Sequence, residues 1–78
     1  MIIKDRVKKI ISQVFVYKID KIDDNTSTNT VERWDSLNHL NLILALEKEF
    51  DIELNIDETV KMLDLLSIVK IIESKLNN

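Results

Sequence analysis

The chain contains neither glycine nor proline among its 78 residues. Tight β-hairpins need backbone conformations with positive φ, which glycine adopts at little steric cost. A β-rich fold of this length is therefore disfavoured. Only four residues are aromatic. Because aromatic side chains are enriched in strands, this low number also argues against a β-rich fold. The composition predicts helices joined by polar loops.

Apolar residues recur at helical spacing in three long segments of the chain. We predict helices over residues 2–15, 35–50 and 64–76, with a further short helix near residues 57–62. Residues 16–34 lack this helical spacing of apolar residues and are rich in small polar residues that favour turns. We therefore predict a long loop there. The expected fold class is all-α, a four-helix bundle with one short helix and a long first loop.

The long first loop should be held to the core near its start and should bind no metal. Its acidic run does not fit a calcium loop. Counted from Asp23, position six is Thr28 instead of Gly and position twelve is Trp34 instead of Glu. The apolar residues expected to pin the early part of the loop are Val16, Tyr17, Ile19 and Ile22.

The net charge is −3, and the charges are unevenly distributed. Residues 1–15 hold four basic residues and one acidic residue, whereas residues 47–64 hold seven acidic residues and two basic ones. The acidic half argues against a nucleic-acid partner and suits a partner with a basic docking patch. The charged start does not fit a signal peptide, and no apolar stretch approaches the roughly 20 residues that span a bilayer. We expect one cytoplasmic, monomeric domain over residues 1–78, without membrane insertion.

Asp35, Ser36 and Leu37 stand where the second long helix is expected to begin. Asp35 is a good N-cap residue, and Ser36 would lie near unpaired backbone N–H groups and the positive end of the helix dipole. Such a position stabilises an anion, for example a phosphodiester. His39 follows three residues later, but no orienting carboxylate is evident that would make Ser36 a nucleophile. Ser36 is either the substrate of another enzyme or, together with Asp35, only a helix cap.

Two longer runs favour the first of these readings. Residues 34–37 read Trp-Asp-Ser-Leu, and residues 43–52 read Ile-Leu-Ala-Leu-Glu-Lys-Glu-Phe-Asp-Ile. Both resemble the second helix of acyl carrier proteins, which begins with Asp-Ser-Leu and ends with Ala-Leu-Glu-x-Glu-Phe. Residues 6–11, Arg-Val-Lys-Lys-Ile-Ile, are similar to the first helix of that family. The resemblance covers nearly the whole chain and is weakest over residues 23–33.

The resemblance implies a carrier that is not itself an enzyme. A phosphopantetheinyl transferase, using Mg²⁺, would move 4'-phosphopantetheine from coenzyme A onto the Ser36 hydroxyl. The terminal thiol of this arm would then carry acyl groups as thioesters, which a chain without cysteine cannot do by itself. The expected partners are this transferase and acyl-transferring or acyl-activating enzymes with basic docking patches.

The resemblance also assigns roles to single residues of the second helix. Asp35 would help to hold the metal of the transferase. Leu37, Leu44 and Glu47 match the positions of the family that face partners. The positions that match the family's core are Leu42, Leu46 and Phe50.

The chain departs from the common fatty-acid carriers in two places. Residues 32–34, Glu-Arg-Trp, replace a glycine that those carriers have before Asp-Ser-Leu, and the second helix is less acidic than theirs. We therefore favour a specialised pathway over housekeeping fatty-acid synthesis. An aminoacyl (D-alanyl or peptidyl) carrier is the alternative, and a helical protein-interaction domain without a prosthetic group is a more distant one. We predict that Trp34 packs against the helix start instead of shielding the arm, and that His39 is a surface residue instead of a phosphate ligand.

Overall fold

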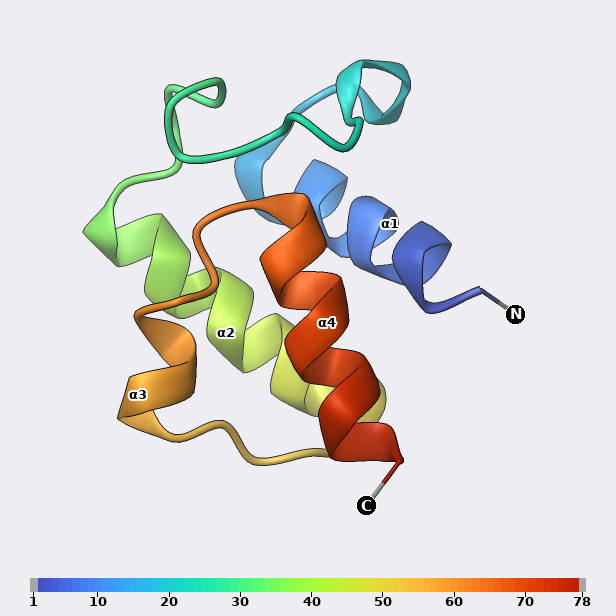
Figure 1. Cartoon of the computed structure of the whole chain (residues 1–78). Coiled ribbons are helices and arrows are strands. Elements are labelled where there is room, and N and C mark those ends of the chain that lie inside the picture. Colours follow the sequence, from blue (N-terminus) through green and yellow to red (C-terminus); the bar gives the residue numbers. More distant parts are fainter. Residues whose placement is uncertain (1, 78) are drawn as a thin grey trace.

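The computed structural model describes residues 2–77, and Met1 and Asn78, the two ends of the predicted domain, lie outside the described residues. Helix α1 spans Ile3–Phe15, α2 spans Ser36–Phe50, α3 spans Ile56–Thr59 and α4 spans Leu65–Leu76 (Figure 1). A single 3-10 turn, η1, covers Ile19–Lys21 in the long loop after α1. No strand occurs among residues 2–77, which confirms the predicted all-α bundle with one short helix.

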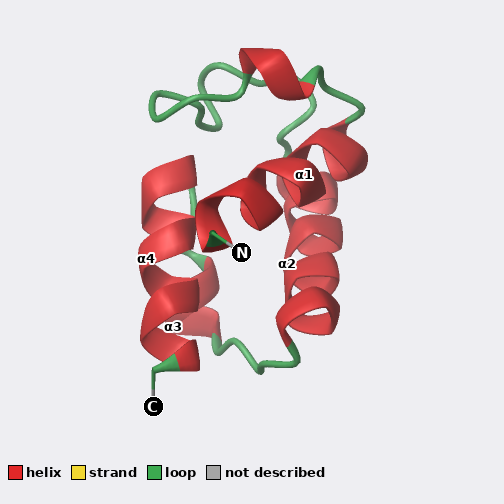
Figure 2. Cartoon of the chain, turned by 90° about the vertical axis from the view of Figure 1, so that its right-hand side faces the viewer, coloured by secondary structure: helices red, strands yellow, loops and turns green. Residues whose placement is uncertain are grey.

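The three long helices enclose one aliphatic core. Figure 2 shows α2 and α4 upright on either side of the molecule, with α1 crossing between them and the long loop lying over one end. Each helix turns its apolar stripe inward, because residues three or four positions apart share one helical face. The core positions predicted on α2 are confirmed as buried. The buried apolar residues are Val7, Ile10, Ile11, Phe15, Ile22, Val31, Trp34, Leu42, Ile43, Leu46, Phe50, Met62, Leu65, Ile68 and Ile72.

Two of the four apolar residues predicted to hold the long first loop to the core do so: Tyr17 is partly buried against the core, and Ile22 is buried in it. Val16 and Ile19 are exposed by 76% and 44%, so their predicted contact with the core is wrong. Val31 and Trp34 anchor the far end of the loop. Val16 turns outward because it is the C-cap of α1 and has left-handed backbone angles, which end the helical register there.

Polar side chains set where the later helices begin. The side chains of Asp35, Asn55 and Asp64 each accept a hydrogen bond from the backbone N–H three residues further on. At Asn55 the bond is reciprocated by Glu58, which completes a capping box. Helix α3 therefore begins one residue before the predicted range 57–62, and it ends three residues before the end of that range. Asp64 lies outside α4 as its N-cap.

A chain without glycine must use other residues where its helices end in a left-handed turn. Val16 has φ 50° and ψ 54° after α1, and Asp51 has φ 54° and ψ 54° after α2. Glycine is the usual residue at such positions, and a left-handed conformation costs other residues about 1–2 kcal/mol. The β-branched side chain of Val16 makes this position the more strained of the two.

Replacing Val16 by glycine should stabilise the protein. Relief of strain outweighs the larger entropy of glycine in the unfolded chain, which is about 0.4–1 kcal/mol. We expect Val16→Gly to raise the melting temperature by several degrees, measured by circular dichroism, since about 1 kcal/mol corresponds to about 4–8 °C in a domain of this size. Asp51→Gly is the control and should give a smaller gain, because aspartate tolerates this conformation better. A Val16→Gly variant that melts at or below the wild-type temperature would contradict the prediction.

Candidate functional site

Ser36 is the first residue of α2 and is exposed to solvent. Oδ1 of Asp35 accepts a hydrogen bond from the N–H of Asn38 at 2.9 Å, which secures the first turn. Within residues 2–77 the backbone N–H groups of Ser36 and Leu37 have no acceptor, and the Ser36 hydroxyl makes no hydrogen bond. The positive end of the helix dipole lies at this first turn, which contains no acidic residue besides the preceding N-cap Asp35. The position therefore suits an anion attached to Ser36.

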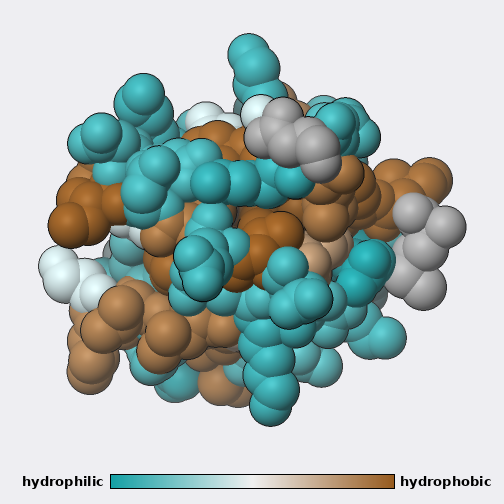
Figure 3. Space-filling view, turned by 90° about the horizontal axis from the view of Figure 1, so that it is seen from below, coloured by the Kyte–Doolittle hydropathy of each residue, from teal (hydrophilic) through white to brown (hydrophobic). Residues whose placement is uncertain are grey.

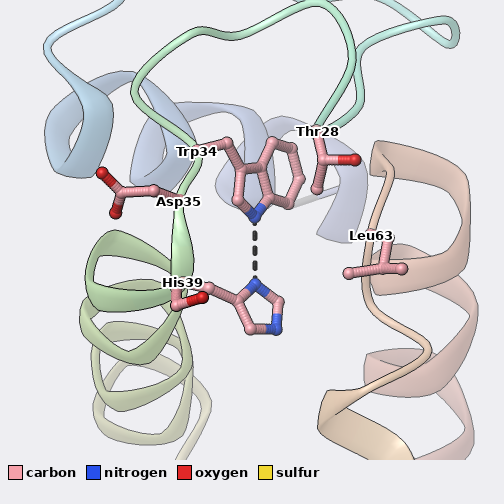
Figure 4. A pocket seen from close by; sticks show the side chains of 6 residues that line it. Thr28, Trp34, Asp35, His39 and Leu63 are labelled. Atoms are coloured by element: carbon pink, nitrogen blue, oxygen red, sulfur yellow. Dashed lines mark hydrogen bonds between the residues drawn. The ribbon is translucent and has the colours of Figure 1, made fainter.

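Asp35 and Ser36 belong to the lining of a pocket of about 250 Å³ at the start of α2, although the side chain of Asp35 points away from Trp34 and His39 (Figure 4). Thr28 from the long loop and Leu63 from the segment before α4 complete the lining. Among residues 2–77, no group of three or more acidic, His or Cys side chains is placed to hold a metal ion. The pocket thus offers a serine hydroxyl and an aromatic wall.

Trp34 packs against His39 at the start of α2, as predicted, and it also belongs to the core. Its side chain is only 5% exposed, and its ring lies 5.0 Å from the ring of Phe15 in a stacked arrangement. The indole N–H donates to Nδ1 of His39 at 3.0 Å, shown by the dashed line in Figure 4. The tryptophan therefore joins α1 to the start of α2 beside Ser36.

His39 is not the surface residue that the sequence suggests. Its ring is half-buried, and Nε2 lies 2.9 Å from the carbonyl oxygen of Thr59, in addition to the bond that Nδ1 accepts from Trp34. Both ring nitrogens are therefore occupied, and His39 cannot serve Ser36 as a base in this arrangement. Sequence reasoning missed this role because Thr59 lies 20 residues further along the chain.

No family model matches the chain. Curated relatives do: an acyl carrier protein of Buchnera aphidicola subsp. Acyrthosiphon pisum (strain 5A) is 37% identical over 73 residues, 94% of this chain and 91% of the relative. The acyl carrier protein of Buchnera aphidicola subsp. Schizaphis graminum is 38% identical over 60 residues, 77% of this chain and 76% of the relative. The chain belongs to the acyl carrier protein family.

The fold leads to the same family. The solution structure of the holo acyl carrier protein from Geobacter metallireducens matches with a TM-score of 0.86 and 31% identity, over 99% of this chain and 88% of that one.

Within residues 2–77, none of the helices combines the length and the apolar character that crossing a membrane requires.

In this acyl carrier protein family member, two of the three predicted partner residues lie on an open face of α2. Leu37 and Leu44 are 70% and 56% exposed, and Leu40 lies between them with 55% exposed. The three leucines follow each other at helical spacing, so they form a ridge along one side of α2, which we call the leucine ridge. Figure 3 shows from below how apolar side chains reach the surface between hydrophilic ones. Contact of Leu37 and Leu44 with a partner stays a prediction.

Glu47, the third predicted partner residue, is half-buried and bonded within the protein. Its Oε2 accepts a hydrogen bond from the N–H of Leu54 at 2.9 Å, which holds the segment between α2 and α3 against α2. Glu47 thus has a structural role that the sequence did not reveal, because Leu54 lies in a loop. Its contact with a partner also stays a prediction.

The acidic stretch 47–64 divides into residues with internal bonds and residues at the surface. Arg6 reaches Oε2 of Glu49 at 2.7 Å, and Lys75 reaches Glu58 at 2.8 Å. The hydrogen bond from Lys75 holds the pKa of Glu58 below its ordinary value, with the Asn55 backbone N–H adding to the effect. These bonds tie α2 to α1 and α3 to α4. Glu49 is exposed despite its bond to Arg6, and the exposed carboxylates of this stretch that make no hydrogen bond or ion pair within residues 2–77 belong to Asp51, Glu53 and Asp57.

Removing the Glu47 carboxylate should therefore destabilise the protein. Glu47→Ala takes away the acceptor of the Leu54 N–H, and a hydrogen bond to a charged group contributes about 1.5–3 kcal/mol when buried and less when partly exposed. We expect a loss of about 1 kcal/mol in the free energy of unfolding, measured in urea. Glu53→Ala removes an exposed carboxylate nearby and should change stability by less than about 0.5 kcal/mol. Equal effects of the two substitutions would show that the bond to Leu54 is not important.

Proposed function

We propose that the chain is an acyl carrier whose Ser36 hydroxyl bears 4'-phosphopantetheine and that it delivers acyl groups, as thioesters of this arm, to other enzymes. The observation that carries the proposal is the exposed hydroxyl of Ser36 at the first position of α2, in a member of the acyl carrier protein family. The holo form of the Geobacter relative is a further support. The arm supplies the thiol that a chain without cysteine lacks.

The residues around Ser36 fit a phosphodiester. The N–H groups of Ser36 and Leu37 have no acceptor among residues 2–77 and can donate to an anion at the helix start. The capping bond of Asp35 uses Oδ1, and the carboxylate is exposed. Asp35 can therefore cap α2 and present its other oxygen to the Mg²⁺ of a phosphopantetheinyl transferase at the same time.

Ser36 is proposed as a substrate and not as a catalyst. Attachment of the arm forms a bond from the Ser36 oxygen to the phosphorus that carries pantetheine, breaks the pyrophosphate bond of coenzyme A and releases adenosine 3',5'-bisphosphate. The hydroxyl proton of Ser36 must pass to a base. His39 has both ring nitrogens in hydrogen bonds and cannot take this proton without breaking one. The transferase has to supply the base, and the carrier then acts as a tethered cosubstrate in the cytoplasm.

The leucine ridge and the exposed carboxylates of Asp51, Glu53 and Asp57 support a docking surface for the transferase and for acyl-handling enzymes. The ridge begins beside Ser36 and follows α2 toward the acidic segment. A partner with apolar pockets framed by basic residues matches this combination. The surface would be the same for an aminoacyl carrier, so the cargo, and not the docking face, distinguishes these two classes.

Modification should occur at Ser36 alone. Incubation with coenzyme A, Mg²⁺ and a broad-specificity phosphopantetheinyl transferase should add one phosphopantetheine to the wild-type chain, measured as intact mass. Ser36→Ala should gain no mass, because it lacks the hydroxyl oxygen. Ser74→Ala removes another exposed serine, on α4, and should be modified like the wild type. A modified Ser36→Ala variant, or a wild type that never gains the arm, would refute the proposal.

Docking should depend on charge and on the leucine ridge. Single exposed ion pairs contribute only about 0–1 kcal/mol, so several must act together. We expect the rate of modification to fall as salt rises, since the screening length is about 10 Å at 0.1 M. The double variant Glu53→Lys, Asp57→Lys and the single variant Leu44→Ala should each slow modification while the melting temperature stays near that of the wild type.

The matched control for charge reversal is Glu73→Lys, on the exposed side of α4. It alters the net charge without touching the acidic segment, so its modification rate should stay close to that of the wild type. Equal slowing by all charge reversals, or kinetics that do not change with salt, would speak against a specific docking surface.

A further inference from the structure

Beside Ser36, two consecutive hydrogen bonds link Trp34, His39 and Thr59. The first runs from the indole N–H of Trp34 to Nδ1 of His39, over 3.0 Å, and the second from Nε2 of His39 to the carbonyl oxygen of Thr59, over 2.9 Å. An indole nitrogen can only donate and a carbonyl oxygen can only accept. His39 therefore accepts at Nδ1 and donates from Nε2, so the two bonds require the neutral ring with its proton on Nε2. We call the His39 ring with these two bonds the His39 latch.

The His39 latch joins α2 to α3. Among residues 2–77 it provides the one hydrogen bond that joins these two helices directly. Three positions beyond His39 and Thr59, the side chains of Leu42 and Met62 are completely buried in the core. The latch thus lies at the edge of the core, on the side where Ser36 begins α2.

On its outer side the latch borders the pocket of about 250 Å³ that Ser36 shares with Trp34 and Leu63 (Figure 4). A group tethered to Ser36 starts in this pocket. If such a group displaced the ring of His39 to pass between α2 and α3, the buried N–H of Trp34 would lose its acceptor. Leaving a buried donor without a partner is unfavourable, so the latch opposes entry into the core.

We propose that His39 is a positioning residue for the cargo, which keeps an acyl chain in the pocket beside Ser36 and out of the core. The inference rests on the proposed function, because it needs an acyl chain tethered at Ser36. A short or polar acyl group is the class of cargo that suits a closed latch, since such a group gains least from burial. A long aliphatic chain gains more from each methylene it buries and is the class that would compete with the latch.

The test compares carriers that bear the arm alone with carriers that bear an octanoyl thioester. The variants are wild type, His39→Ala, His39→Gln and, as a matched control, Asn41→Ala on the exposed side of α2. We expect octanoylation to raise the melting temperature at least twice as much in His39→Ala as in wild type. His39→Gln keeps one acceptor and one donor and should behave like the wild type, as should Asn41→Ala. The same rise in all four proteins would overturn the proposal.

A second measurement does not depend on melting. Hydroxylamine cleaves an exposed thioester, so cleavage of the octanoyl form should be slower in His39→Ala than in wild type if the chain enters the opened core. Should His39→Ala fail to fold, Trp34→Phe removes the donor to Nδ1 but keeps an aromatic ring on Phe15, and it should shift both readouts in the same direction. Unchanged cleavage rates in the folded variants would count against the latch.

Intact mass separates the failure of this inference from that of the proposed function. If all variants accept the arm but octanoylation shifts their melting temperatures equally, the proposed role of the His39 latch is overturned and the proposed carrier function is not. A wild-type chain that cannot be loaded at Ser36 overturns both.

Discussion

The buried indole of Trp34 determines how Ser36 is presented. The ring is stacked on Phe15 of α1 and donates to His39 of α2, so it is fixed to two helices at once. The next two residues, Asp35 and Ser36, are exposed, and α2 begins at the surface directly above this anchor. The Ser36 hydroxyl is thereby exposed beside residues that are packed into the core, although a long loop precedes it.

The long loop stays in place without glycine and with few apolar anchors. Thr26 is buried, and its hydroxyl accepts a hydrogen bond from the N–H of Asp23 at 2.8 Å. Its carbonyl oxygen accepts from the N–H of Leu65, and the N–H of Thr28 donates to the carbonyl oxygen of Leu63. These bonds connect the loop to the start of α4 and complete the wall of the pocket beside Ser36. These polar contacts act together with the apolar anchors of the loop, which include the predicted Tyr17 and Ile22.

The short helix α3 depends on its surroundings in the same way. A helix of four residues is not stable in isolation, because nucleation costs more than so few hydrogen bonds return. Here the capping box of Asn55 and Glu58 starts it, the ion pair of Glu58 with Lys75 ties it to α4, and the His39 bond ties it to α2. Glu58, the one acidic residue in these bonds, already has partners within the protein, as Glu47 and Glu49 do. The charge that remains at the surface is therefore smaller and more localised than the composition indicates.

Local rules were sufficient for the helices and for most of the core. The apolar period and the N-caps Asp35 and Asp64 act within a few residues, and they predicted the all-α bundle. The resemblance to acyl carrier proteins predicted the family and the buried Leu42, Leu46 and Phe50. Tertiary structure decided the roles of His39 and Glu47. The partners of these two residues, the Thr59 carbonyl and the Leu54 N–H, are backbone groups, which carry no signature in the sequence. A side chain that bonds a distant backbone group can be recognised only once the fold has brought the two together.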